Sequence, residues 1–184
     1  MEWFDVCNEE GCLTGEKVER KRAHAEGICH RTVHIWVVRF REGRPEILLQ
    51  KRAADKDSFP GRFDTSSSGH IQAGDEPDFS ACRELEEELG IMAAEEELTF
   101  IQTFRIKYEK EFHGSLFKDN EIAFLYLYEK PVEEAGLILQ AEEVECVRWF
   151  DLEEVYAAVS VHDQTFCVPS ESLHILREYL KKRE

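Results

Sequence analysis

Short segments rich in β-branched and aromatic residues occupy the first third of the chain and predict strands. Residues 3–14 predict a hairpin that turns at Asn8-Glu9-Glu10-Gly11, and residues 16–25 predict a short charged helix. Residues 33–40 predict a strand that ends in a turn cluster, from which residues 46–52 return as a second strand. Residues 65–72 predict a further strand.

Helical spacing appears in the middle of the chain and again at its end. Phe79, Cys82, Leu85 and Leu89 predict one apolar helix face, and Gly90 is placed to end that helix. Further strands are predicted at 98–108, 121–128 and 144–149, and helices at 151–159 and from Ser170, the predicted N-cap, with an apolar stripe of Leu173, Ile175, Leu176 and Leu180. This order indicates an α+β fold with a mixed β-sheet flanked by helices.

Length and composition narrow the class of protein. The chain has 184 residues, of which 42% are hydrophobic, and we expect one domain over residues 1–184. We expect no membrane association, because no apolar run approaches the ~20 residues of a membrane span. A net charge of −16 repels a nucleic acid backbone, so we expect no nucleic acid polymer as partner. A small phosphorylated substrate held by local basic groups and cations remains compatible with that charge.

The six cysteines are scattered, without a Cys-X-X-Cys pair, and we interpret them as free thiols of a cytoplasmic protein. A zinc site formed by Cys7, Cys12, His24 and His30 is an alternative, but its spacing fits no standard zinc finger.

Three acidic residues give the clearest chemical indication. Glu84, Glu87 and Glu88 are three and four positions apart, so on a helix their side chains share a face. Clustered carboxylates repel one another, and a divalent cation such as Mg²⁺ relieves that repulsion with hard oxygen ligands. The alternative is a solvated charged face, which is the usual role of an acidic run.

The segment from residue 69 to residue 91 resembles the Nudix box. That motif has a glycine, five residues, an acid, seven residues and then Arg-Glu-apolar-X-Glu-Glu-X-Gly-apolar. The matching residues are Gly69, Arg83, Glu84, Leu85, Glu87, Glu88, Gly90 and Ile91, whereas Asp75 stands where the family usually has Glu. So many matches at the right spacing favour metal binding over a solvated face.

The resemblance implies a Nudix-type α/β/α sandwich and a Mg²⁺-dependent hydrolase, with Mn²⁺ as a substitute ion. Such enzymes cleave the diphosphate linkage of nucleoside diphosphate derivatives. Glu84, Glu87, Glu88 and the Gly69 carbonyl would hold metal, and Glu87, Glu121 and Arg83 would be catalytic. Arg83 would orient a box carboxylate; the alternative is a plain surface pair with Glu87.

Residues outside the box complete the candidate site. Glu121, in Asp119-Asn120-Glu121, would be an extra metal ligand or general base, or else part of an acidic turn beside an edge strand. Arg52 and Lys56 are candidates for binding substrate phosphate. Dispersed aromatic residues would form a base pocket, and the candidates are Trp3, Phe4, Phe63, Phe112 and Phe117.

A second resemblance, over roughly residues 1–150, is to isopentenyl diphosphate isomerase and its hydrolase relatives. It is carried by His24, His30-Arg31, Trp36, residues 49–53, Lys56, Pro60-Gly61, Gly69-His70 and residues 119–121. It implies a second metal site formed by His24, His30, His70, Asp119 and Glu121; each histidine could instead be structural, as we expect of His34.

The sequence leaves three functions open. A hydrolase is favoured. An isomerase is disfavoured because that family has a cysteine immediately before the Gly-His or Ser-His pair, where this chain has Ser68. A non-catalytic Nudix domain that only binds a ligand is disfavoured by the intact glutamates. The assembly would be a monomer or a homodimer.

Overall fold

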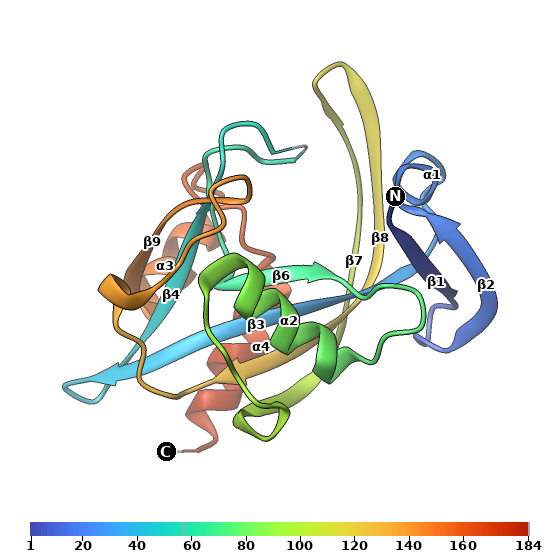
Figure 1. The fold of residues 1–184 in the computed structure, drawn as a ribbon. Helices are drawn as coiled ribbons and strands as arrows, with labels where there is room; N and C mark the ends of the chain where they lie inside the picture. Colours follow the sequence, from blue (N-terminus) through green and yellow to red (C-terminus); the bar gives the residue numbers. More distant parts are fainter. Residues whose placement is uncertain (57, 184) are drawn as a thin grey trace.

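Runs of strands separated by helices follow one another along the chain in the mixed order that the sequence predicts (Figure 1). The structure is a computed structural model that describes residues 1–56 and 58–183. The strands are β1 Trp3–Cys7, β2 Leu13–Glu19, β3 His30–Arg41, β4 Arg44–Arg52, β5 Phe63–Asp64, β6 Ser67–His70, β7 Leu98–Phe112, β8 Ser115–Tyr128 and β9 Val144–Asp151. The helices are α1 Arg20–Glu26, α2 Pro77–Leu89, α3 Leu152–Ser160 and α4 Ser170–Lys181, with short 3-10 turns at Glu95–Glu97 and Glu134–Gly136.

Strand β3 is the centre of the larger sheet. On one side it runs parallel to β8, with His30 opposite Glu121. On the other side it pairs antiparallel with β6 along its first half and with β4 along its second half. Strands β5 and β9 pair with β4, and β7 pairs with β8, all antiparallel. The predicted α+β class with a mixed sheet is therefore confirmed.

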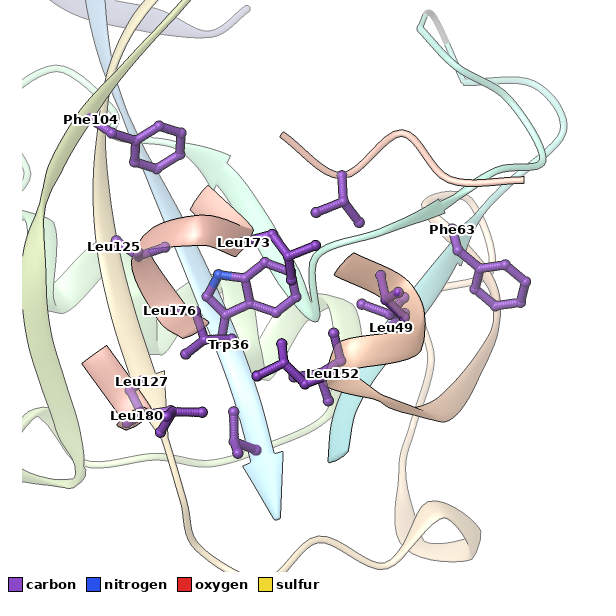
Figure 2. Close-up of a cluster of buried hydrophobic side chains, with 14 of the residues drawn as sticks. Trp36, Leu49, Phe63, Phe104, Leu125, Leu127, Leu152, Leu173, Leu176 and Leu180 are labelled. Atoms are coloured by element: carbon purple, nitrogen blue, oxygen red, sulfur yellow. The ribbon is translucent and has the colours of Figure 1, made fainter. Parts of the chain in front are cut away.

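Successive side chains of β3 point to opposite faces of this sheet, as in any β-strand, and both faces are covered. Trp36 and Val38 pack with helices α3 and α4, and Figure 2 shows the Trp36 indole beside Leu173 and Leu176 of α4. The indole Nε1 donates a hydrogen bond of 3.0 Å to the Ser172 hydroxyl, so the one polar atom of this ring is satisfied in the core. This side of the sheet carries the two C-terminal helices.

The opposite face of the sheet packs against α2. Ala81, Leu85 and Leu89 of the helix contact Val33 and Ile35 of β3 in a second core cluster. The result is a three-layer arrangement, helix, sheet and helices, as the α/β/α prediction requires.

One detail of the α2 prediction is wrong. Phe79 is 51% exposed rather than packed, and Cys82 is only partly buried. The buried stripe follows four-residue steps from Ala81, and Phe79 lies on the far side of the helix from that stripe. Glu84 and Glu88 are therefore neighbours of the buried apolar stripe.

Both chain ends also depart from the predicted boundaries. Residues Leu13–Glu19 form a strand paired with β1, and the charged helix is confined to Arg20–Glu26. Val18 explains why this segment is a strand and not a helix, because it is 2% exposed and packs with Phe4 of β1. At the other end, Pro169 occupies the N-cap position of α4, and Ser170 is the first helical residue without a side-chain capping bond.

The β7–β8 hairpin is longer than predicted and continues to a turn at His113 and Gly114, both of which have positive φ. Asp119 and Glu121 consequently lie within β8, opposite Tyr108 and Ile106, and not in an acidic turn. Among the described residues, every helix falls short of the length and apolarity that crossing a bilayer requires.

Candidate functional site

A cavity of about 300 Å³ opens between α2, the N-terminal half of β3, the β7–β8 hairpin and the residues Lys56, Ser58 and Phe59. Its walls include the three box glutamates, Gly69 and His70 on one side. His24, Asp119 and Glu121 line it from the other side. Residues that the sequence assigned to two separate motifs thus share one cavity.

Glu88 lines the cavity, and three donors hold its carboxylate in place. The Ser67 hydroxyl at 2.6 Å, the Ser68 backbone N–H at 3.1 Å and the Gln50 side-chain amide at 3.1 Å all donate to the same oxygen, Oε2. The other oxygen, Oε1, takes no part in these bonds. A buried carboxylate held in this way has a defined orientation and one oxygen to spare for a ligand.

Glu84 packs directly on Gly69. A Cβ atom added to Gly69 would lie 2.1 Å from Cδ of Glu84, so only glycine leaves room for this carboxylate. The close approach brings strand β6 and helix α2 together at the cavity wall. It supplies a steric reason for the glycine that begins the box.

Arg83 connects several of these groups. Its guanidinium lies 3.0 Å from Oε1 of Glu84 and donates to Oε2 of Glu87 at 3.1 Å and to the His70 carbonyl at 3.0 Å. The Arg83 side chain is 18% exposed. It is therefore more than a plain surface pair with Glu87.

The three box glutamates differ in their surroundings. Glu84 and Glu88 are 9% and 6% exposed, whereas the Glu87 side chain is 51% exposed at the rim. Burial, together with the charge of Glu88, raises the pKa of Glu84 to about 8, against the pull of Arg83. Burial also raises the pKa of Glu88. Two desolvated carboxylates that lack sufficient positive charge are the donor set a divalent cation fits.

A second cluster lies beside the first. His24 Nε2 is 3.2 Å from His70 Nε2, and both His30 Nε2 and His70 Nε2 are 3.7 Å from Oε1 of Glu121. His24 Nδ1 is 3.6 Å from Oδ1 of Asp119. The structure thus brings all five residues of the predicted second metal site together.

Several buried atoms of this cluster have no hydrogen-bond partner among the residues that the structure describes. They are Nδ1 of His24, Nε2 of His30 and Oδ1 of Asp119. Unsatisfied buried polar atoms are costly, and these three are donor atoms that a bound cation would satisfy. The ligand atoms of His24, His30 and His70 lie within 4.8 Å of one another, as do those of His30, Asp119 and Glu121, which fits a cation.

The pKa values of the residues in this cluster are shifted in different directions. Burial, reinforced by the charge of His30, lowers the pKa of His24 to about 4, and burial lowers the pKa of His70. Burial opposes protonation of His30, but the neighbouring Glu121 carboxylate raises its pKa. Burial and the Glu121 charge raise the pKa of Asp119 to about 9, while the histidines overcome burial and lower the pKa of Glu121.

The two predicted phosphate ligands line the cavity, but both have protein partners. Arg52 donates to Asp64 Oδ2 at 3.1 Å and to the Ser58 carbonyl at 2.9 Å. Lys56 forms an ion pair with Glu143. A substrate phosphate would have to share these cations with the carboxylates.

The five aromatic candidates for a base pocket lie in different surroundings. Phe117 lines the cavity and stacks on His24 with ring centroids 4.3 Å apart. Phe4 is fully buried and stacks on His30 and His70, whereas Phe63 belongs to the main core. Trp3 is 47% exposed, and Phe112 packs at the hairpin tip against Phe59 and Phe117.

The sequence interpretation missed several cavity residues, among them Thr32, Phe59, Asp64 and Tyr108. Thr32 donates to Oε2 of Glu121 at 3.1 Å. Tyr108 lies directly opposite Asp119 across the hairpin, so the pairing of the two strands would have revealed it. For Asp64, the sequence carries no local indication, because its partner Arg52 belongs to another strand.

The chain matches the family model of the NUDIX domain over residues 30–167. It is 39% identical over 167 residues to Nudix hydrolase 3 of Arabidopsis thaliana, which covers 90% of this chain and 21% of that protein. An uncharacterized Nudix hydrolase of Clostridium acetobutylicum is 41% identical over 144 residues, 78% of this chain and 66% of the relative. The chain therefore spans about a fifth and just under two thirds of these two relatives' lengths.

The crystal structure of DR0079 from Deinococcus radiodurans has the same fold. Its TM-score is 0.69 at 16% identity, with 96% of this chain and 98% of that chain covered. The family model covers most of the chain and includes the helix with Glu84, Glu87 and Glu88. On these grounds, the chain belongs to the Nudix family.

Proposed function

We propose that this protein is a Mg²⁺-dependent hydrolase of a diphosphate linkage in a nucleoside diphosphate derivative or a similar small phosphorylated metabolite. The observation that carries the proposal is the pair of buried carboxylates, Glu84 and Glu88, held on one helix face at a cavity wall. We further propose that residues 1–184 form one cytoplasmic Nudix domain, as a monomer or a homodimer.

Glu84, Glu87, Glu88 and the Gly69 carbonyl would hold the cation, with Mn²⁺ as a substitute. When bound, the ion supplies Lewis acidity, neutralising phosphate charge and making water a stronger acid. Arg83 holds Glu84 and Glu87 in place through its two ion pairs. Arg52 and Lys56 would add positive charge beside a diphosphate.

His24, His30, His70, Asp119 and Glu121 would hold a second cation. The lowered pKa keeps Glu121 ionised at neutral pH. A carboxylate with a low pKa is a good ligand and a weak base. Of the two roles expected for Glu121, metal ligand and general base, the electrostatics favour the ligand.

Hydrolysis of nucleoside di- and triphosphates, nucleotide sugars, dinucleotides, coenzyme A and prenyl diphosphates, each with Mg²⁺ or Mn²⁺, tests the proposal. We expect turnover of at least one class, and we expect Glu87→Gln to lower kcat/KM by about 100-fold without changing the fold, because a ligand is lost. Glu86→Gln is the control, since Glu86 is an exposed neighbour on the same helix. Activity of Glu87→Gln within about tenfold of wild type, a barrier change of only ~1.4 kcal/mol, would exclude a central role for Glu87.

An isomerase of isopentenyl diphosphate is the second candidate, and the five-residue His and acid cluster is the observation that favours it. Ser68 argues against it, because this residue lines the cavity where the isomerase family has a cysteine, and a serine hydroxyl is a far poorer proton-transfer group. We expect no conversion to dimethylallyl diphosphate with Mg²⁺ in the absence of flavin. A trace of isomerase activity gained by Ser68→Cys would support this interpretation. Robust conversion by the wild type would make the hydrolase assignment wrong.

A further inference from the structure

Two cysteines far apart in sequence lie side by side near the loop end of the N-terminal hairpin. Cys7 ends strand β1, and Cys29 lies between α1 and β3, beside the His cluster in sequence (Figure 1). Their sulfur atoms are 3.5 Å apart, with the Cys7 thiol donating to Cys29. We propose that Cys7 and Cys29 form a redox site that closes to a disulfide on reaction with a small disulfide such as oxidised glutathione.

The backbone fixes this pairing. The Cys7 N–H donates to the Cys29 carbonyl at 3.0 Å. This hydrogen bond holds the two main chains side by side, and the two sulfur atoms already lie 3.5 Å apart, against the ~2.05 Å of a disulfide bond. A bond between the two sulfurs therefore requires side-chain rotation and little movement of the main chain.

The exposure of the two thiols sets the order of the two exchange reactions. Cys7 is 3% exposed, whereas Cys29 is partly exposed and so is the thiol that an external reagent reaches first. The Cys29 sulfur attacks one sulfur of the small disulfide, and a mixed disulfide forms while one thiol leaves with the proton. The Cys7 sulfur then attacks Cys29 and releases the second thiol. Two protein thiols are oxidised and one small disulfide is reduced to two thiols.

The remaining cysteines lack this arrangement in the described residues. Cys12 is exposed on the loop of the same hairpin, and the Cys167 thiol donates to the Phe63 carbonyl at 3.5 Å. Disulfides are uncommon in reducing compartments, and those that occur there are mostly transient or redox-sensing. A pair poised at 3.5 Å but reduced is what such a site requires.

A Cys7–Cys29 bond would act on the neighbouring His cluster. His30 follows Cys29 directly, and Phe4, three residues before Cys7, stacks on His30 and His70 at 4.8 Å and 4.5 Å. The closed loop would also contain His24 of α1. The bond would therefore restrain the ring positions of this cluster, whether or not the protein is a hydrolase.

The test compares the full chain after incubation with oxidised glutathione and with dithiothreitol. Free thiols are counted, trapped with an alkylating reagent and assigned by peptide mass spectrometry. We expect loss of two of the six thiols, a Cys7–Cys29 linked peptide, and a Tm about 5 to 10 °C higher in the oxidised form. Dithiothreitol should reverse all three changes.

Cys7→Ser and Cys29→Ser should each abolish the linked peptide and the Tm change, and Cys12→Ser, the matched control on the same hairpin, should keep both. Six free thiols after oxidation of the wild-type chain, or a linkage that joins Cys12 to either partner, would overturn the proposal. The wild-type peptide map decides the matter even if a serine variant fails to fold.

Discussion

At the scale of single residues, the buried carboxyl groups of the cavity dominate the behaviour of the metal-free protein. Glu84 and Asp119 are each 9% exposed, and burial raises the pKa of both to values of about 8 and 9. Each therefore holds a proton at neutral pH that the unfolded chain, with ordinary values near 4, has already released. Folding and protonation are linked at these sites.

The free energy of unfolding of the metal-free protein should consequently fall between about pH 7 and pH 8.5. In this window unfolding releases the proton that each buried group still holds, so raising the pH lowers the free energy of unfolding by up to about 1.4 kcal/mol per pH unit for each group. The His24 pKa of about 4 leaves that histidine neutral throughout the window in the folded state. Chemical denaturation in EDTA at about pH 7 and pH 8.5 measures how much the free energy of unfolding changes with pH.

Glu84→Gln should flatten this slope, because the amide does not titrate. Added Mg²⁺ should restore stability to the wild type most strongly at the higher pH, where the carboxylates are charged. Identical slopes for wild type and Glu84→Gln would show that Glu84 is not protonated in the folded, metal-free protein.

Glu121 is the residue through which the second cation site can be tested. Glu121→Gln should reduce the number of bound Mn²⁺ ions by one in equilibrium binding and should lower kcat strongly with little change in KM. The control is Glu109→Gln, since Glu109 is exposed on the outer part of the same hairpin. Unchanged kcat together with unchanged Mn²⁺ stoichiometry would return Glu121 to a structural role.

At the scale of secondary structure elements, the contact between β6 and α2 determines the geometry of the box. Gly69→Ala should lower kcat/KM by about 100-fold, because the new Cβ occupies the position of the Glu84 carboxylate. That carboxylate is the end of a flexible side chain, so it should move aside and the fold should survive. Steady-state kinetics and thermal melts measure the two effects separately.

Gly136→Ala is the matched control, since a Cβ there would have no atom of the described residues within 4 Å. Gly69→Ala with normal kcat/KM would mean that the position of Glu84 is not critical. If the alanine at position 69 instead unfolded the protein, β6 would be the rigid partner in this contact.

At the scale of the whole molecule, the sheet assembles the cavity from segments distant in sequence. The parallel pairing of β3 with β8 sets His30 beside Glu121, and the antiparallel pairing of β3 with β6 sets Thr32 beside His70. The N-terminal hairpin adds Phe4 beneath these rings. Helix α2, the sheet and the N-terminal hairpin therefore converge on one site, although the molecule as a whole carries a charge of −16.

The sequence by itself determined the α2 helix, the order of strands and the chemistry of the box, because these depend on residues three or four apart or on alternation within one segment. It could not determine that Glu87 lies at the rim while Glu84 and Glu88 are buried, since burial depends on which helix side meets the sheet. Nor could it reveal the partners of Arg52 and Lys56, or the contact of Cys7 with Cys29. Those depend on strand pairing and register, which only the folded chain fixes, because residues far apart in sequence become neighbours through non-local hydrogen bonds and packing.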